Sequence, residues 1–304
     1  MDALSTVLEA TALKIIVYNK LTFSGPWGLD VVKDENSQFW RLVSGCCIVG
    51  LHDGQTIEMA EGDLVFVPHG SAHWIADKTT SLRMPSPEFV KARREGIPVF
   101  NNAGPETILI GGHFEFDYHA LHPFLNDLPQ VIHIRQFGTQ HQLLLKQISQ
   151  LMLAELNDEM PGSKVMLKCL SEIMFITIIR AYLEQTTPQS GFLSALNNSR
   201  ISKALKLIQD LPENDWTLES LASEVGMSRS VFFNQFKKFV HETPLTYLTN
   251  WRIRKAQKLL MADNSNIAEI AMSVGYQSGA AFNRIFKEKT GVTPAVYRRS
   301  NLAK

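Results

Sequence analysis

The chain has 304 residues, which is enough for about two domains. Its 30 Lys and Arg balance its 30 Asp and Glu, which excludes a strongly charged chain as a whole, but the charges are unevenly distributed. Residues 200–304 hold 16 basic and 9 acidic residues, whereas residues 1–199 hold 14 and 21. This asymmetry predicts a C-terminal domain that binds a polyanion and an N-terminal domain with another role.

The cysteines, the N-terminus and the longest apolar stretch indicate the cellular compartment of the protein. Cys46, Cys47 and Cys169 do not form a disulfide framework and are expected to be buried thiols. Residues 1–12 lack the basic start and apolar core of a secretory signal. The longest apolar stretch, 173–183, is too short to span a bilayer. We therefore expect a soluble, cytoplasmic protein without membrane contact.

Short apolar runs bounded by turn residues follow from Gln38 to about Phe116. Their spacing predicts an antiparallel β-sandwich or barrel. Residues 78–105 interrupt the pattern, because they are charged and rich in Pro and Gly, and they predict a long loop.

Within this region stands Gly62-x5-Pro68-x-Gly70-x2-His73. The pattern resembles the second conserved motif of the cupin family, which implies that His73 points into the barrel. In metal-binding cupins this histidine is one of several ligands, and the first motif supplies the others. The corresponding strand, 38–42, has no His-x-His pair, and Trp40 stands where relatives tend to have His. Relatives often have Cys where this chain has Gly111.

A metal needs about three or four protein ligands, and His73 has only His69 and His113 as further candidates. We therefore expect no metal and no cofactor. Instead we expect a small organic effector, because Trp40 replaces a metal donor with a flat apolar wall. Trp74 follows His73 in a strand and should face the opposite way. The expected ligand-binding residues are His73, Trp40, His69 and His113.

Residues 139–185 return to helical periodicity. A first helix has one apolar face made of Leu143, Leu144, Ile148, Leu151 and Met152. A second helix, 165–183, is apolar over much of its circumference, which predicts burial on more than one side. It could pack against the barrel alone or also seal a subunit interface, and we favour both, in a homodimer.

Two segments of the C-terminal third repeat each other. The first runs from Leu221 to Asn234 and recurs 49 residues later, and the offset then changes to 50 at Phe236 and Phe286. Each contains a short apolar helix, a glycine that ends it, and a serine that caps a second helix. Such a unit is a helix-turn-helix, and two in tandem predict a sequence-specific DNA-binding protein.

The run Ile270-Ala271…Gly275-Tyr276…Phe282…Phe286-Lys287 resembles the hallmark of the AraC/XylS type of DNA-binding domain. Gly25-Pro26-Trp27-Gly28 and 112–116 are similar to the subgroup with an N-terminal cupin domain. The resemblance covers nearly the full length. It implies a transcription regulator that reads a small-molecule or chemical signal, binds double-stranded operator DNA and acts on RNA polymerase.

The exposed faces of the two second helices are the expected base readers. Arg suits guanine and Asn suits adenine in the major groove, and lysines further along each helix suit phosphate. The helix at 253–261 should join the two units with Arg252, Arg254, Lys255 and Lys258 largely outward. The expected DNA-binding residues are Arg229, Ser230, Phe233, Asn234, Lys237, Ser278, Gly279, Asn283, Arg284 and Lys287.

The sequence thus predicts an α+β, two-domain protein that is not an enzyme. The expected parts are a cupin-like barrel over 1–137, a helical packing and dimerisation segment over 138–186, a linker over 187–200 and a double helix-turn-helix domain over 201–304. Two alternatives stay open at this point: a cupin-type enzyme with an accessory domain, and an architectural DNA binder without a ligand. Activation and repression are not distinguished.

Overall fold

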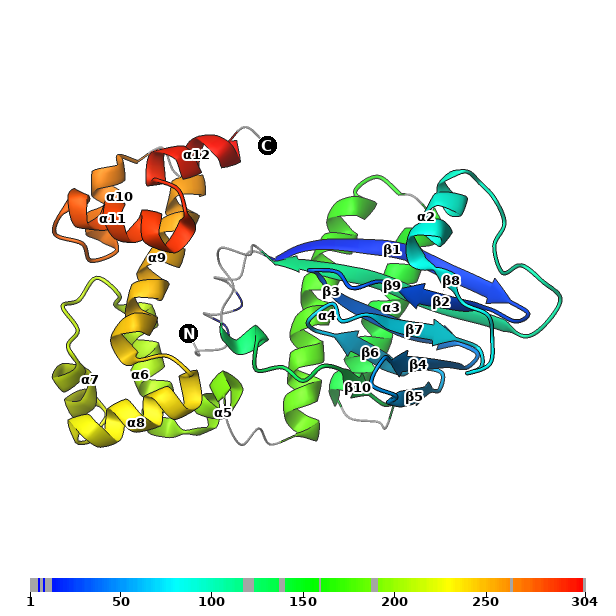
Figure 1. The fold of residues 1–304 in the computed structure, drawn as a ribbon, viewed down its shortest axis with the longest axis horizontal. Helices are drawn as coiled ribbons and strands as arrows, with labels where there is room; N and C mark the ends of the chain where they lie inside the picture. Colours follow the sequence, from blue (N-terminus) through cyan, green and yellow to red (C-terminus); the bar gives the residue numbers. More distant parts are fainter. Residues whose placement is uncertain are drawn as a thin grey trace. The chain divides into compact units, whose positions relative to one another are not determined.

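The computed structural model describes Ser5, Leu8 and residues 13–116, 123–136, 140–158, 160–186, 191–262 and 265–302. The chain forms two compact units, as the two-domain α+β prediction requires (Figure 1). The sheet unit comprises Leu13–Phe116 and Leu128–Thr186, and the helical unit comprises Met1–Ala12, Asp117–Asp127 and Thr187–Lys304. The first four residues of the expected linker, 187–190, lie outside the described residues.

The sheet unit contains two five-stranded sheets. The strand order of the first is β1 (Leu13–Ser24), β9 (Glu106–Phe116), β3 (Ser37–Ser44), β6 (Leu64–Val67) and β10 (Ile132–Ile134). The order of the second is β5 (Thr56–Met59), β4 (Cys47–Leu51), β7 (His73–Ala76), β2 (Gly28–Val31) and β8 (Met84–Pro85). Paired strands are antiparallel except β2 and β8.

Strand β3 shows how the period of two builds a core on each side of the first sheet. Trp40 and Leu42 point between the two sheets into a shared apolar core. Phe39 lies on the other face, where its ring stacks 5.0 Å from that of Phe114. Phe175 of α4 (Ser163–Gln185) lies 5.1 Å from Phe114 and covers that face.

Helix α3 (Gln140–Asp158) packs against α4, but its buried face differs from the predicted one. The buried residues include Ile148 and Met152, as predicted. They also include Leu145, which the prediction did not place on the buried face. Leu143 and Leu151 are 57% and 56% exposed, so the assignment of these two to the buried face was wrong. Periodicity selected a stripe shifted around the helix, because its apolar residues extend over more than one face.

Residues 78–105 are not a plain loop, which corrects the prediction. They contain β8 and α2 (Ser86–Arg94). Phe89 of α2 is buried, and its ring lies 5.6 Å from that of Phe23 in the shared core. One apolar residue among charged neighbours anchors this helix, so hydrophobic periodicity gave no signal for it.

The helical unit is built from eight described α-helices of the C-terminal part of the chain. They are α5 (Gly191–Asn197), α6 (Ser199–Asp210), α7 (Leu218–Glu224), α8 (Arg229–Val240), α9 (Pro244–Ala262), α10 (Ile267–Ser273), α11 (Gly279–Thr290) and α12 (Pro294–Leu302). The unit also includes η2 (Pro123–Leu125), from the stretch expected in the barrel domain. Phe124 packs 6.4 Å from Phe192, and Asp127 accepts a hydrogen bond from the Phe192 amide at 2.5 Å.

Candidate nucleic-acid interface and effector site

Helices α7 and α8 form the first helix-turn-helix. Thr217 caps α7 in a reciprocal capping box with Ser220, which satisfies backbone donors at the helix start. Gly226 follows α7 with φ of 63°, a conformation that favours glycine, so the chain can turn into α8. Phe232 and Phe236 of α8 are fully buried and hold the helix in its core.

Helices α10 and α11 form the second helix-turn-helix by the same means. Asn266 and Glu269 make its capping box, and Gly275 turns the chain with φ of 90°. Ser278 caps α11 by accepting from the Ala281 amide at 3.5 Å. Phe282 and Phe286 are fully buried, like Phe232 and Phe236.

The structure corrects the register of the repeat. α8 begins at Arg229 and α11 at Gly279, so the offset between these helices is already 50 at their first residues. The extra residue lies in the turn, and Phe282 corresponds to the buried Phe232 instead of Phe233. Phe233 therefore lies half-buried on the outer face of α8. Its counterpart in α11 is Asn283.

The expected DNA-binding residues lie on the outer faces of α8 and α11. All of them are exposed except Phe233, which is half-buried. Arg229 at the start of α8 forms an ion pair with Glu219 of α7, with 2.9 Å between nitrogen and oxygen. The structure brings five of the expected residues onto each helix or its cap, as the helical period requires.

An open hollow of about 640 Å³ lies where the first turns of α7 and α8 meet. Its apolar wall consists of Leu218 and Phe233, and its polar rim of Ser228, Arg229, Ser230 and Asn234. Sequence analysis did not identify Leu218 as a site residue, because in the sequence it reads as a residue of the helix core.

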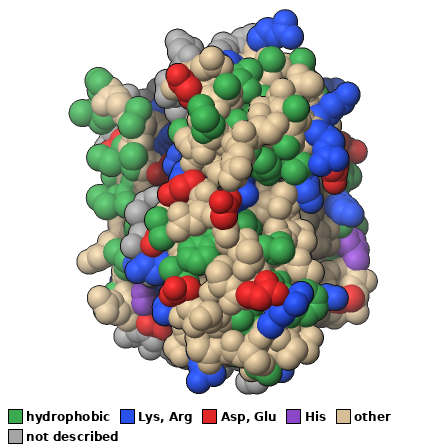
Figure 2. All heavy atoms as spheres, turned by 90° about the vertical axis from the view of Figure 1, so that its left-hand side faces the viewer, with side chains coloured by type: hydrophobic (Ala, Val, Ile, Leu, Met, Phe, Trp, Pro, Cys, Tyr) green, Lys and Arg blue, Asp and Glu red, His purple; other side chains and the backbone are tan. Residues whose placement is uncertain are grey.

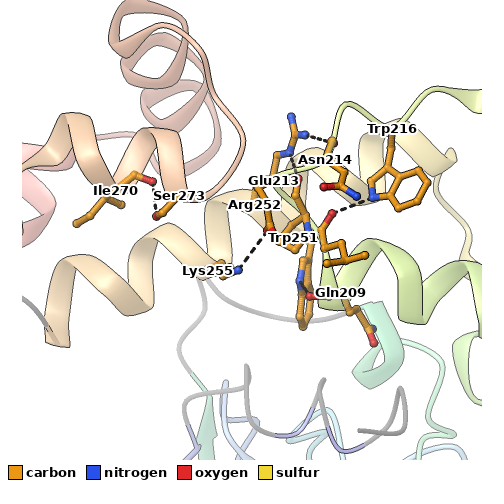
Figure 3. Close-up of polar contacts among 11 residues, drawn as sticks. Gln209, Glu213, Asn214, Trp216, Trp251, Arg252, Lys255, Ile270 and Ser273 are labelled. Carbon is orange, nitrogen blue, oxygen red and sulfur yellow. Dashed lines mark hydrogen bonds and ion pairs between the residues drawn. The ribbon is translucent and has the colours of Figure 1, made fainter.

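Arg252 of α9 does not point outward, which corrects the prediction for this residue (Figure 3). Its Nε donates to the Pro212 carbonyl at 2.7 Å, and its Nη2 donates to the Asn214 carbonyl at 2.9 Å. Trp251, which precedes Arg252 in α9, donates from its indole Nε1 to the Gln209 carbonyl at 3.2 Å. Arg252 also lies 5.6 Å from the centre of the Tyr276 ring, so it joins the loop before α7 to the second helix-turn-helix.

Arg254 is also half-buried, whereas Lys258 is exposed as predicted. Lys255 is half-buried and forms an ion pair with Glu213 at 3.7 Å. Figure 2 shows Lys and Arg side chains in separate groups on this side of the molecule, with hydrophobic side chains between them. The basic side chains on this face of the molecule are therefore not gathered into one continuous patch.

His73 and Trp40 meet between the two sheets, and both are buried. The Trp40 indole donates from Nε1 to His73 Nε2 at 2.8 Å, and His73 Nδ1 donates to the Ser71 carbonyl at 2.8 Å. This network assigns the proton of the neutral ring to Nδ1. Burial lowers the pKa of His73. Trp74 faces away, with Arg83 stacked 4.5 Å above its ring, as the strand period predicts.

Trp40 occupies the space above Gly111, its cross-strand partner. A β-carbon at position 111 would lie 2.7 Å from the Trp40 ring. The two departures from the common family pattern, Trp40 and Gly111, are therefore one local change, in which a large ring is accommodated by the loss of a side chain opposite it.

The other two expected ligand residues lie apart from this pair. His69 is exposed and donates from Nε2 to the Leu128 carbonyl at 2.8 Å. His113 Nε2 lies 3.1 Å from Glu115 Oε1. Within the described residues, no three His, Cys, Asp or Glu side chains are grouped to hold a metal ion. Both His73 nitrogens bond to protein groups, so this residue set does not fit a cupin metal centre.

A larger hollow, of about 1000 Å³, opens where the edge strands β5 and β10 of the two sheets approach each other. Asp63 is buried there, 3.0 Å from His133 Nε2, and accepts from the Gln136 amide at 2.9 Å. Arg135 and Met59 also line it. Burial raises the pKa of the neighbouring Cys47 to about 12, which keeps that thiol protonated. No sequence motif links these residues, because about 70 positions separate them. Cys46 and Cys169 are exposed, so the expectation that they are buried was wrong.

Among the described residues, none of the helices has both the length and the apolar composition of a membrane-spanning segment.

Comparisons with known proteins match both units. The Cupin family profile matches residues 2–184, and the Helix-turn-helix domain profile matches residues 221–300. The HTH-type transcriptional regulator AlkR of Acinetobacter baylyi is 30% identical, over 99% of this chain and 100% of that protein. A putative AraC-like transcription regulator of Streptomyces antibioticus is 29% identical, over 98% of this chain and 99% of that protein.

Solved structures match the C-terminal part. The DNA-binding domain of the global transcriptional factor AdpA, crystallised in complex with a target DNA, is 29% identical. The match covers 34% of this chain and 92% of that one, with a TM-score of 0.32.

Proposed function

Because the chain belongs to the AraC-type transcriptional regulators with an N-terminal cupin domain, we propose that it reads one asymmetric operator and that a small organic molecule controls this reading. The observation that carries the proposal is the pair of exposed helices α8 and α11, each anchored by two buried phenylalanines and joined through α9. A major groove admits one α-helix.

The geometry of the linker supports a two-box site. Buried residues of α9 belong to the core of the second helix-turn-helix, including Ile253, Ala256 and Leu260. At the other end of α9, the Tyr247 ring lies 5.8 Å from that of Phe236 in the first. A helix shared by two cores fixes the spacing of α8 and α11. The expected site therefore has two short boxes about one DNA turn, roughly 34 Å, apart, with bending where the spacing requires it.

For the effector we retain the region of His73 and Trp40, with His69 and His113 as outlying candidates. The two central side chains fill the space between them, so an effector that reaches His73 has to take the place of the Trp40 indole. Such a ligand would be aromatic or apolar with one hydrogen-bond donor for His73 Nε2. Ligand binding can shift DNA affinity only by its differential affinity for two states of the protein.

A selection experiment tests the function. The full-length protein is used to enrich bound DNA from a random pool, with and without candidate metabolites. We expect one sequence with two boxes, and an enrichment that one class of metabolite changes. Equal affinity for random DNA would instead support an architectural binder, and turnover of a metabolite would support an enzyme.

The output of the bound regulator is proposed to pass through RNA polymerase. Transcription reconstituted with purified polymerase on the selected operator would show whether the regulator activates or represses. A polymerase rate that is the same with and without bound regulator would contradict this part of the proposal.

A further inference from the structure

The hollow between α7 and α8 combines features that differ from a simple solvated helix face. Its wall is apolar, made by the half-buried Leu218 and Phe233, and its rim is polar. It lies along the N-terminal half of α8, the part of a recognition helix that contacts base edges in helix-turn-helix proteins. An apolar wall at that place makes no hydrogen bond to a base.

In the major groove, one apolar group of the DNA bases is suited to contact the apolar wall of the hollow. Adenine, guanine and cytosine present hydrogen-bond donors and acceptors there, whereas thymine also presents its 5-methyl group. Contact between that methyl group and Leu218 and Phe233 would remove apolar surface from water on both partners. The polar residues of the rim can then form hydrogen bonds with the flanking bases, since Arg229 suits guanine and Asn234 suits adenine.

We propose that the first helix-turn-helix recognises a thymine by seating its 5-methyl group in the hollow formed by Leu218 and Phe233. This inference rests on the proposed DNA-reading function and specifies one base of the first box. Arg229 contacts a neighbouring base from the rim of the same hollow. Glu219, 2.9 Å from Arg229, is a positioning residue that holds the guanidinium at that rim in the free protein.

The equivalent residues of the second helix-turn-helix do not provide the same apolar wall. When α8 and α11 are aligned at their first residues, Asn283 corresponds to Phe233. In the same alignment Gly279 corresponds to Arg229. The methyl contact through Phe233 should therefore map to one box only. Any methyl effect in the other box, for example against Ala280 or Ala281, should be independent of Phe233.

The test replaces each thymine of the selected operator, one at a time, by deoxyuridine. This change removes the methyl group and leaves every hydrogen-bonding group in place. At one thymine of the first box we expect affinity to fall about fourfold, the change that corresponds to one buried methyl group. In Phe233→Ala, thymine and deoxyuridine at that position should bind equally well.

Val231 provides the matched control. It is an exposed apolar residue of the same helix and does not line the hollow. Val231→Ala should keep the thymine preference, and circular dichroism should show both variants folded. If every deoxyuridine operator binds like the thymine operator, the methyl contact is refuted while sequence-specific binding stands. If selection yields no sequence at all, the proposed function itself fails. A thymine preference that survives in Phe233→Ala would also overturn the inference.

Discussion

The hydrogen bond from Trp40 to His73 sets the charge state of the interior between the sheets. Burial is the main cause that lowers the pKa of His73 below its usual value of 6.5. The hydrogen bond to the Ser71 carbonyl raises this pKa, the nearby His52 lowers it further, and the charge of Asp30 raises it. A second proton would have to sit on Nε2, which already accepts from the Trp40 indole. Protonation therefore breaks this bond and leaves two donors facing each other.

The first prediction follows from the direction of that pKa. Because the folded-state pKa lies below 6.5, the unfolded chain takes up the proton first as the pH falls. The contribution of His73 to the free energy of unfolding is fully present above 6.5 and is lost as the pH falls through the folded-state value. Thermal unfolding from about pH 8 to about pH 5 should show this loss in the wild type and less of it in His73→Gln.

His69 is the control for this titration, because it is exposed and is not among the groups that shift the pKa of His73. His69→Gln keeps a side-chain donor for the Leu128 carbonyl and should leave the loss of stability caused by His73 in place. An unchanged profile in His73→Gln would show that another group causes the loss of stability.

A second prediction separates base reading from phosphate binding. Arg229→Ala should weaken binding to the selected operator by about 1–3 kcal/mol and relax preference at a few base pairs. Lys237→Ala should weaken all sequences alike and reduce the slope of log affinity against log salt by about one. Titrations of operator and random DNA at several salt concentrations measure both. Equal losses on operator and random DNA in Arg229→Ala would contradict a base-reading role.

At the scale of elements, the contact between α9 and the loop before α7 holds the two helix-turn-helix units together. A β-carbon at Gly275 would lie 2.8 Å from Arg252 Nη2 and 2.8 Å from the Glu213 Cα. Gly275 therefore serves two purposes, since it turns the chain with positive φ and allows this close approach. Close packing at this point keeps the loop, α9 and α10 in one arrangement.

The third prediction compares two glycines, each of which follows one helix of the second helix-turn-helix. Alanine in the left-handed region costs roughly 1–2 kcal/mol, so both Gly275→Ala and Gly291→Ala should lower the free energy of unfolding. Gly291 has φ of 79° but no atom within 4 Å of an added β-carbon. Gly275→Ala should lose more stability, because Arg252 or the Glu213 backbone must also move. Urea unfolding measures both, and equal losses would show that the Arg252 contact is not tight.

At the scale of the whole molecule, helices α3 and α4 expose apolar side chains on the side that does not pack against the sheet. α4 buries Met174 and Phe175 against the sheet, but Val165, Met166 and Ile173 are at least 44% exposed. Exposed apolar residues grouped on adjacent helices often mark a protein interface. We propose that a second copy of the chain covers them, which would bring two DNA-binding units to one promoter.

The fourth prediction tests this homodimer. Ile173→Asp should give a folded monomer, because a charge on the exposed side of α4 opposes burial in an interface but leaves the packed side intact. Lys168→Asp, an exposed position of the same helix, should leave the dimer unchanged. Sedimentation at micromolar concentration distinguishes the two. A wild-type protein that sediments as a monomer would refute the dimer.

The sequence by itself determined the features that depend on neighbours along the chain. Thr217 and Asn266 cap their helices, Gly226 and Gly275 turn the chain with positive φ, and the period of two separates His73 from Trp74. Caps, turns and strand alternation arise from backbone geometry within a few residues, and for that reason they can be read directly.

Only the tertiary structure decided which apolar and charged side chains turn inward. It placed Phe232 in the core and left Phe233 at the surface, and it turned Arg252 onto carbonyl groups 40 and 38 residues away. It also joined Trp40 to His73 across two sheets. Each of these outcomes depends on a partner distant in sequence, and neither helical nor strand periodicity contains information on which partner a folded chain will supply.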